Sequence, residues 1–201
     1  MKVYHCAQTR SVRVLWLLEE LGVPYDLVQF DFTPENLKKP EFLRISPLGK
    51  VPVIQDGELT MFESGAIVEY ILEKYGNGRL APAPGTPARG RFLQWIHFAE
   101  ATASPPFSEM AQHTMVKPEA ERIPAVVADA HGRAVAMAGV VEHALAGTQY
   151  LLGAEFSAAD IMMGYTVLLM KWFGVLSDAY PNTLAYIARL EARPALQKAL
   201  S

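Results

Sequence analysis

The sequence lacks most of the features that mark secreted, membrane or disulfide-stabilised proteins. Its 201 residues include one cysteine, so a framework of disulfide bonds is excluded and a reducing compartment is expected. No apolar run reaches the roughly 18 residues of a membrane span. The opening residues 1–7 also lack the long apolar stretch of a secretory signal. We therefore predict a cytoplasmic protein with no membrane partner.

A strong excess of charge is absent as well. The chain has 18 basic and 21 acidic residues, and the basic ones are scattered rather than gathered along one face. Because nucleic-acid binding needs such a basic patch, we expect no nucleic-acid partner. His97 and His113 have no second ligand at a metal-like spacing, so no metal is expected either. Apolar residues make up 51% of the chain, enough for one large core or two smaller ones.

The first part of the chain alternates strand and helix signals. Apolar residues at helical spacing end at Gly22, and the Asp56-Gly57 pair between two apolar runs is typical of a β-hairpin. The expected strands and helices fall at residues 2–6 (strand), 11–21 (helix), 25–30 (strand), 51–61 (hairpin) and 64–75 (helix), with a short helix between the second strand and the hairpin. A helix between strands of one sheet makes a βαβ unit. The pattern predicts a βαβαββα order, which is a thioredoxin-like arrangement.

Residues 76–87 are dense in glycine and proline and show no periodicity, as is typical of a linker between domains. Beyond this stretch the strand signals vanish, and helix-forming residues recur at helical spacing. We therefore predict an α/β domain at 1–78, a linker at 79–87 and an all-α domain at 88–201.

A helix start is predicted with unusual clarity at Ser157. Its hydroxyl can cap the helix, the Asp160 carboxylate can return a hydrogen bond, and Phe156 can pack against Ile161. This pattern of cap and hydrophobic staple serves folding, so we assign Asp160 no catalytic role.

Residues 49–64 are the most informative about function. Proline cannot donate to a sheet ladder, so Pro52 lies at a strand edge and leaves the backbone of Val51 for an external partner. The free N–H groups at the helix start, beside the Ser64 hydroxyl, suit an anion, and Glu63 can hold an ammonium group. An anion site, a cation site and a free peptide edge together indicate a zwitterionic peptide ligand.

This segment resembles the glutathione-binding segment of cytosolic glutathione S-transferases. In that family the residue before a cis-proline pairs with the cysteinyl backbone of glutathione, and a Glu-Ser pair binds its γ-glutamyl end. The glutathione-binding residues implied by the resemblance are Val51, Pro52, Glu63 and Ser64. The capped segment at 156–161 is similar to one in the family's helical domain, so the resemblance covers nearly the whole chain. It implies glutathione as a co-substrate.

Transferase chemistry needs a donor that stabilises the glutathione thiolate. A thiol with a pKa of ~8.5 is only slightly ionised at neutral pH, and a pKa lower by ~2 units, or about 2.7 kcal/mol, would ionise most of it. The resemblance places the donor in the turn after the first strand, where Thr9, Arg10 and Ser11 precede or open a helix whose dipole favours a negative sulfur. All three are candidates, and Ser11 also suits a simple N-cap.

Other residues near this turn have competing interpretations. The run from Thr9 to Gly22 resembles a microbial branch in which the turn is Ser-Arg-Ser, with threonine replacing the first serine. Tyr4 lies near the position where other classes carry a catalytic tyrosine, although tyrosines in strands mostly pack. Cys6 has no Cys-x-x-Cys partner, so we expect a buried, inert thiol rather than a redox nucleophile.

The remaining parts of the expected site are a cation and an acceptor pocket. The cation for the glycyl carboxylate comes from Lys38, Lys39 or Lys50, and Lys50 is best placed because it adjoins Val51. The electrophile is expected between the two domains, since interfaces of this kind bury apolar ligands well. The residues expected to line its site are Glu100, Ser104, Phe107, Met110 and Trp172.

The sequence is therefore interpreted as a glutathione S-transferase that joins the glutathione thiolate to a hydrophobic electrophile. The resemblance also implies a homodimer with contacts through the helices at 63–75 and 88–103. A glutathione-using isomerase, dehalogenase or peroxidase is the first alternative, because the same thiolate serves each reaction. A non-enzymatic binding module on this fold is the second.

Overall fold

A four-stranded mixed sheet forms the centre of the first of two compact units in the computed structural model, which describes residues 1–201. The strands, in the spatial order β2-β1-β3-β4, are β1 (Lys2–His5), β2 (Asp26–Gln29), β3 (Val53–Asp56) and β4 (Leu59–Phe62). β1 and β2 are parallel, whereas β3 is antiparallel to both of its neighbours. The predicted βαβ unit and hairpin are present, and the thioredoxin-like arrangement is confirmed.

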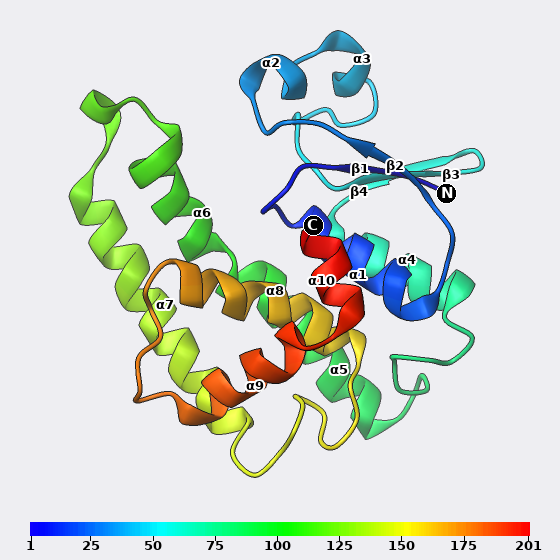
Figure 1. Cartoon of the computed structure of the whole chain (residues 1–201), viewed down its shortest axis with the longest axis vertical. Coiled ribbons are helices and arrows are strands. Elements are labelled where there is room, and N and C mark those ends of the chain that lie inside the picture. Colours follow the sequence, from blue (N-terminus) through cyan, green and yellow to red (C-terminus); the bar gives the residue numbers. More distant parts are fainter. The chain divides into compact units, whose positions relative to one another are not determined.

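Helices cover both faces of this sheet (Figure 1). α1 (Ser11–Leu21) and α4 (Ser64–Tyr75) pack together on one face. The short helices α2 (Pro34–Leu37) and α3 (Pro40–Leu43) lie on the other. The predicted bounds of α1 and α4 match the structure. For α1 the stop is physical, because Gly22 adopts a left-handed conformation with φ 66° and its N–H bonds back to the helix.

Alternation along β1 and β3 divides the apolar residues between the two faces. Val3 pairs with Ile54 in the register, and both are fully buried on the face of α1 and α4. Tyr4 pairs with Val53 on the opposite face, in a smaller cluster with Phe42 of α3. Both faces of the sheet are therefore packed, which fixes the strand ends from which the functional loops extend.

The hairpin turn is tied to α4 through Asp56. Its Oδ2 atom accepts hydrogen bonds from the Tyr70 hydroxyl at 2.8 Å, the Lys74 ammonium at 2.7 Å and the Tyr75 hydroxyl at 2.7 Å. Burial alone would raise the pKa of Asp56, but the bonds from Lys74 and the two tyrosines outweigh it and lower this pKa to about 2. The cluster ties the end of β3 to α4, and β4, which follows the turn, leads directly into Glu63.

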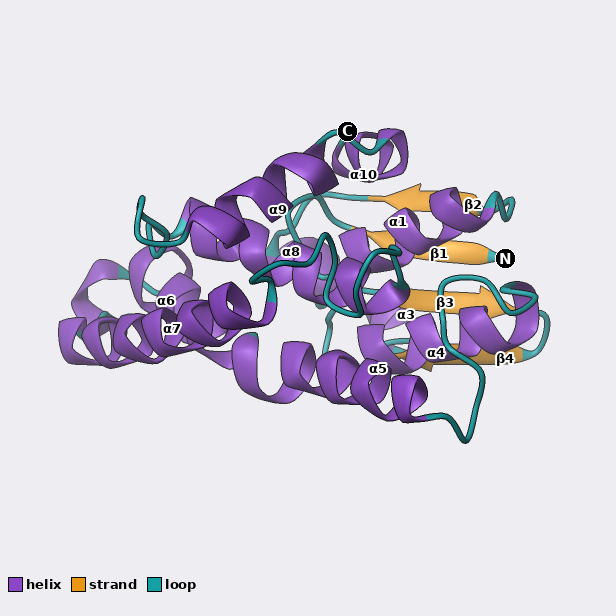
Figure 2. Cartoon of the chain, turned by 90° about the horizontal axis from the view of Figure 1, so that it is seen from below, coloured by secondary structure: helices purple, strands orange, loops and turns teal.

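The second unit, residues 82–190, is built from helices (Figure 2). Its helical elements are α5 (Pro87–His97), the π-helical turn η1 (Phe98–Ala103), α6 (Pro105–Ala111), the π-helical turn η2 (Gln112–Val116), the 3-10 turn η3 (Glu119–Glu121), α7 (Pro124–Ala144), α8 (Ala158–Trp172) and α9 (Pro181–Glu191). The predicted all-α character is confirmed, since one isolated bridge between Tyr150 and Gly153 is the only β-pairing there. None of the helices is both long and apolar enough to cross a membrane.

The predicted cap of α8 is present and reaches further than expected. Ser157 and Asp160 form a reciprocal capping box at the start of the helix. The buried Asp160 carboxylate also accepts from the Leu151 N–H and from the Tyr186 hydroxyl, each at 2.9 Å. One carboxylate thus joins α8, α9 and the loop before α8, which supports the structural role assigned to it.

The end of the chain differs from the predicted domain plan. Residues 191–201 belong to the first compact unit, together with residues 1–81. There α10 (Pro194–Leu200) packs on α1, and Arg193 forms two hydrogen bonds to the Glu20 carboxylate, at 2.6 and 2.7 Å. Helical composition alone placed this segment in the all-α domain, because composition does not say which core a helix covers.

Candidate functional site

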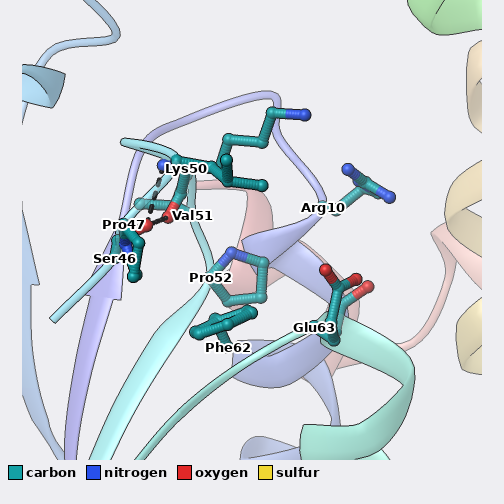
Figure 3. A pocket seen from close by; sticks show the side chains of 10 residues that line it. Arg10, Ser46, Pro47, Lys50, Val51, Pro52, Phe62 and Glu63 are labelled. Atoms are coloured by element: carbon teal, nitrogen blue, oxygen red, sulfur yellow. Dashed lines mark hydrogen bonds between the residues drawn. The ribbon is translucent and has the colours of Figure 1, made fainter. Parts of the chain in front are cut away.

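A pocket opens in the first unit where three segments meet (Figure 3). They are the turn before α1, the loop that leads into β3, and the junction between β4 and α4. The lining residues are Arg10, Ser46, Pro47, Leu48, Lys50, Val51, Pro52, Phe62, Glu63 and Ser64. Of the predicted glutathione-binding residues, only the alternative lysines Lys38 and Lys39 do not line it. The pocket also includes Arg10 but neither Thr9 nor Ser11.

The loop before β3 is held in shape by Ser46 and Gly49. The buried Ser46 hydroxyl donates to the Lys50 carbonyl at 2.7 Å and accepts from the Lys50 N–H at 2.9 Å. Gly49 has a φ of 60°, and a Cβ atom there would lie 2.5 Å from the Leu37 carbonyl oxygen. A side chain is therefore excluded at this position on both counts. The result is a tight loop that delivers Val51 to the pocket.

Val51 and Pro52 present a short backbone edge. The peptide bond between them is cis, as the resemblance implied. Val51 precedes the paired register of β3, whose ladder with β1 and β4 begins at Val53. The sheet therefore does not use the N–H and C=O groups of Val51, and an extended peptide could pair with them as an added strand would.

Glu63 and Ser64 form the opposite side of the pocket. Glu63 has a φ of 76°, a left-handed conformation that costs a non-glycine residue free energy and is typical of functional sites. Ser64 is the first residue of α4 and is 2% exposed. Its neighbouring backbone N–H groups stand at a helix N-terminus, which attracts anions. The carboxylate and the helix start therefore offer adjacent sites for a cation and an anion.

Arg13 adds a positive charge behind this anion site, and the sequence analysis missed it. The side chain is fully buried in α1, and its Nη1 donates to the Ser64 hydroxyl at 3.1 Å. A buried guanidinium held at a hydroxyl strengthens the local preference for negative charge. The one signal in the sequence is that Arg13 interrupts the otherwise apolar run at residues 12–18.

Arg10 and Glu63 lie on the same side of the pocket, with Pro52 between them and the Ser46–Lys50 loop (Figure 3). Arg10, and not Ser11, occupies the N-cap position of α1, and no side chain at this position forms a capping hydrogen bond. The alternative interpretation of Ser11 as an N-cap is therefore wrong. Its hydroxyl is engaged within the turn instead.

The turn between β1 and α1 contains a compact group of hydroxyls. The Thr9 and Ser11 hydroxyl oxygens are 2.6 Å apart. Both donate toward the Cys6 carbonyl, at 2.8 Å from Thr9 and 3.2 Å from Ser11. Ser11 is fully buried and also contacts the His5 Nδ1 atom at 2.7 Å, whereas Thr9 is half-buried. Of the two residues, Thr9 is the more accessible.

Tyr4 and Cys6 are both committed to packing. The Tyr4 hydroxyl donates to the Gln55 Oε1 atom at 2.8 Å, and its ring packs near Phe42. The Cys6 side chain is fully buried, and burial, with a smaller effect from the Asp31 charge, raises the pKa of its thiol to about 11. A thiol with this pKa is protonated at neutral pH, which agrees with the predicted inert cysteine.

The residues expected at the electrophile site differ widely in exposure. Phe107 and Met110 are buried in the second unit, and the buried Ser104 hydroxyl donates to the Ala99 carbonyl at 2.6 Å. Trp172 is 46% exposed at the end of α8, and Glu100 is half-buried in η1. Helical spacing had not distinguished core positions from surface positions in this set.

Histidines do not gather with other ligands in the structure. His113 accepts a hydrogen bond from the Ile123 N–H at 3.0 Å, and its other nitrogen lies 3.3 Å from the Lys117 ammonium. This is a structural role at the turn before α7. No group of three or more His, Cys, Asp or Glu side chains is placed to hold a metal ion.

Sequence comparison identifies both halves of the chain. The profile described as "Glutathione S-transferase, N-terminal domain" matches residues 1–73, and "Glutathione S-transferase, C-terminal domain" matches residues 109–201. A probable glutathione S-transferase of rice, GSTF1, is 34% identical over 98% of this chain and 94% of its own length. Glutathione S-transferase 4 of maize is also 34% identical, over 98% of this chain and 91% of the maize protein.

Solved structures agree with these relatives. BphK, a bacterial glutathione transferase solved as a ternary complex, superposes with a TM-score of 0.87 at 27% identity and covers 100% of this chain and 98% of its own. A theta-class enzyme from Xanthomonas axonopodis pv. citri, solved with glutathione bound, gives a TM-score of 0.84 at 30% identity over 99% of this chain and 96% of its own. With both domains matched along its length, the chain belongs to the glutathione S-transferase family.

Proposed function

We propose that this protein binds glutathione in the pocket beside Val51 and transfers its thiolate to a hydrophobic electrophile. The observation that carries the proposal is the pairing, in one pocket, of the Val51 backbone edge with the Glu63 carboxylate and the N-terminus of α4. Solved relatives that hold glutathione or its disulfide support the choice of ligand.

The γ-glutamyl end of glutathione binds at the start of α4. Its carboxylate accepts hydrogen bonds from the Ser64 hydroxyl and the helix N–H groups, with the buried Arg13 charge behind them. Its ammonium group pairs with Glu63. The left-handed backbone of Glu63 places its carboxylate beside the helix start. The ammonium group and the carboxylate of the ligand therefore bind at two adjacent residues, Glu63 and Ser64.

The rest of the tripeptide extends along the loop before β3. Its cysteinyl backbone pairs with Val51, and its glycyl carboxylate meets the Lys50 ammonium. Lys50 is supported over the alternatives because it lines the pocket, whereas Lys38 follows α2 outside it and Lys39 precedes α3. This orientation directs the thiol toward the turn before α1.

The thiolate is stabilised by Thr9 and Arg10. Thr9 is the more accessible of the two residues, and its hydroxyl donates directly to the sulfur. Ser11 stands behind it, and Arg10 adds positive charge from the pocket wall. The sulfur then attacks the electrophilic carbon, and the new thioether bond forms as the leaving group departs with its electron pair. Binding brings the two reactants together, and the lowered pKa makes the thiol nucleophilic.

The electrophile and the subunit arrangement are further parts of the proposal. Glu100 and Trp172 are the expected residues with accessible side chains, so they are the first to test as contacts of the electrophile. A homodimer in the cytoplasm accords with the family. Because Cys6 is buried, any redox reaction of this protein would use the glutathione sulfur and not a protein thiol.

The test is calorimetric titration of the protein with glutathione, followed by a conjugation assay with a chlorodinitrobenzene acceptor. Because Glu63→Gln and Ser64→Ala each remove a charged hydrogen bond, we expect either to weaken binding roughly 10- to 150-fold. Glu58→Gln, an exposed carboxylate of the same unit, is the matched control and should bind as the native protein does. Native affinity in Glu63→Gln, or no binding by the native protein, would refute the proposal.

A further inference from the structure

A buried histidine stands behind the hydroxyls of the turn before α1. His5 is the last residue of β1 and is 4% exposed. Its Nδ1 atom lies 2.7 Å from the Ser11 hydroxyl, which lies 2.6 Å from the Thr9 hydroxyl. Three side chains therefore form a continuous line of short hydrogen bonds that begins inside the protein and ends at its most accessible member, Thr9.

The protons available to this line limit how it can be arranged. Each hydroxyl has a single proton, and the Cys6 carbonyl, which only accepts, lies within reach of both. When the Thr9 proton points to the Cys6 carbonyl, no proton is left for a sulfur beside Thr9. When it points to the sulfur, Ser11 is free to donate to Thr9 over 2.6 Å rather than to Cys6 over 3.2 Å.

His5 decides between these arrangements through its own proton. Burial lowers the pKa of His5, so its imidazole is neutral at neutral pH and has one N–H. A proton on Nδ1 donates to Ser11 and orients the line outward, whereas a bare Nδ1 accepts the Ser11 proton and orients it inward. Hydrogen bonds in such a chain polarise one another, so the outward arrangement makes Thr9 a stronger donor.

We propose that His5 is a positioning residue for the glutathione thiolate: its Nδ1–H donates to Ser11, Ser11 donates to Thr9, and Thr9 donates to the sulfur. The proposal rests on the proposed function, since it needs glutathione bound with its sulfur at Thr9. None of the three side chains gives up a proton in this arrangement. The thiol proton goes to solvent, and the three side chains only direct hydrogen bonds to the charge that remains.

The first experiment is an ultraviolet titration of the bound thiol in the native protein and in His5→Phe, His5→Asn and Thr9→Ala. If Thr9 lowers the thiol pKa by ~2 units and each added bond in a chain strengthens it by about 10–30%, His5→Phe should raise this pKa by about 0.2–0.6 unit. His5→Asn offers an amide donor near the position of Nδ1 and should restore the native value. His97→Asn, at an exposed histidine of the second unit, is the control.

The second experiment does not depend on a variant that folds. In native protein with ¹⁵N-labelled histidine, the shifts of the two His5 nitrogens report which one has the proton. We expect the proton on Nδ1 in the glutathione complex. A bare Nδ1 in the complex means that Ser11 donates its proton to His5 and not to Thr9. The line of hydrogen bonds is then oriented inward, which overturns the proposal.

The outcomes separate this proposal from the proposed function. If the native complex has a lowered thiol pKa that Thr9→Ala abolishes and His5→Phe leaves unchanged, His5 is only a packing residue and the proposed function stands. If glutathione does not bind, or binds with an ordinary thiol pKa, both are overturned. A shift in His5→Phe that His5→Asn reverses supports the positioning role, because a loss of packing would not be repaired by a donor.

Discussion

Replacement of Asp56 by asparagine should lower the free energy of unfolding at neutral pH but not in strong acid. The native carboxylate is 9% exposed and accepts hydrogen bonds from two tyrosines and Lys74, which lower its pKa from 3.8 to about 2. A shift of this size corresponds to at most about 2.4 kcal/mol. Because Lys74 is 46% exposed, solvent screening reduces the expected value to about 1 kcal/mol.

The pH dependence follows from the sign of the shift. A carboxyl group with a lower pKa in the folded state stabilises the protein fully above its unfolded pKa of 3.8, and this stabilisation is lost as the pH falls toward about 2. The amide introduced by Asp56→Asn does not titrate. The free energy of unfolding of the native protein should therefore exceed that of Asp56→Asn at pH 7, and the two values should converge near pH 2.

Urea unfolding, followed by circular dichroism at pH 7 and near pH 2, measures this difference. Asp26→Asn, at an exposed carboxylate on β2, is the control and should leave stability unchanged at both pH values. A gap between the native protein and Asp56→Asn that is equal at the two pH values would refute the reasoning, since it would show that the ionised form has no special stabilisation.

Three further substitutions or reactions test other parts of the structure. Gly49→Ala should reduce the free energy of unfolding by roughly 1–3 kcal/mol and weaken glutathione binding, because its Cβ atom would meet the Leu37 carbonyl. Urea unfolding measures the first effect and calorimetry the second. Gly85→Ala is the matched control, because the added Cβ atom meets no atom within 4 Å at a similar left-handed φ. Asp160→Ala should cost about 2–4 kcal/mol in thermal unfolding because it removes a helix cap and leaves buried donors unpaired, and an unchanged melting temperature would contradict the structural role. Cys6 should react with a thiol reagent at pH 8 only after unfolding, and rapid reaction of the native protein would show that the thiol is accessible.

Local signals in the sequence were sufficient for most of the fold. The bounds of α1 and α4 were predicted because a glycine ends the first helix and a Glu-Ser pair opens the second. The hairpin was placed by its Asp-Gly turn, although its first strand begins only at Val53, after the proline that cannot join the ladder. These features depend on residues that are adjacent in the sequence, so local sequence patterns predict them.

The candidate site was predictable where its residues adjoin one another and not where they meet through the fold. Val51, Glu63 and Ser64 were proposed from the resemblance, and all line one pocket. Arg13 was missed because its partner Ser64 lies 51 positions away, and the role of His5 behind Ser11 depends on the path of the turn between them. The electrophile residues and the microbial-branch turn stay predictions.

The placement of residues 191–201 has a consequence for how the protein is made. The first compact unit is discontinuous, since its sheet comes from the beginning of the chain and α10 from residues 194–200, with the whole helical unit inserted between them. A ribosome must therefore synthesise the entire second unit before the first can be completed. Until then the surface of α1 that α10 covers is open, including the Glu20 carboxylate that later binds Arg193. A fragment cut at the linker would keep the glutathione pocket residues but carry this same exposed surface permanently.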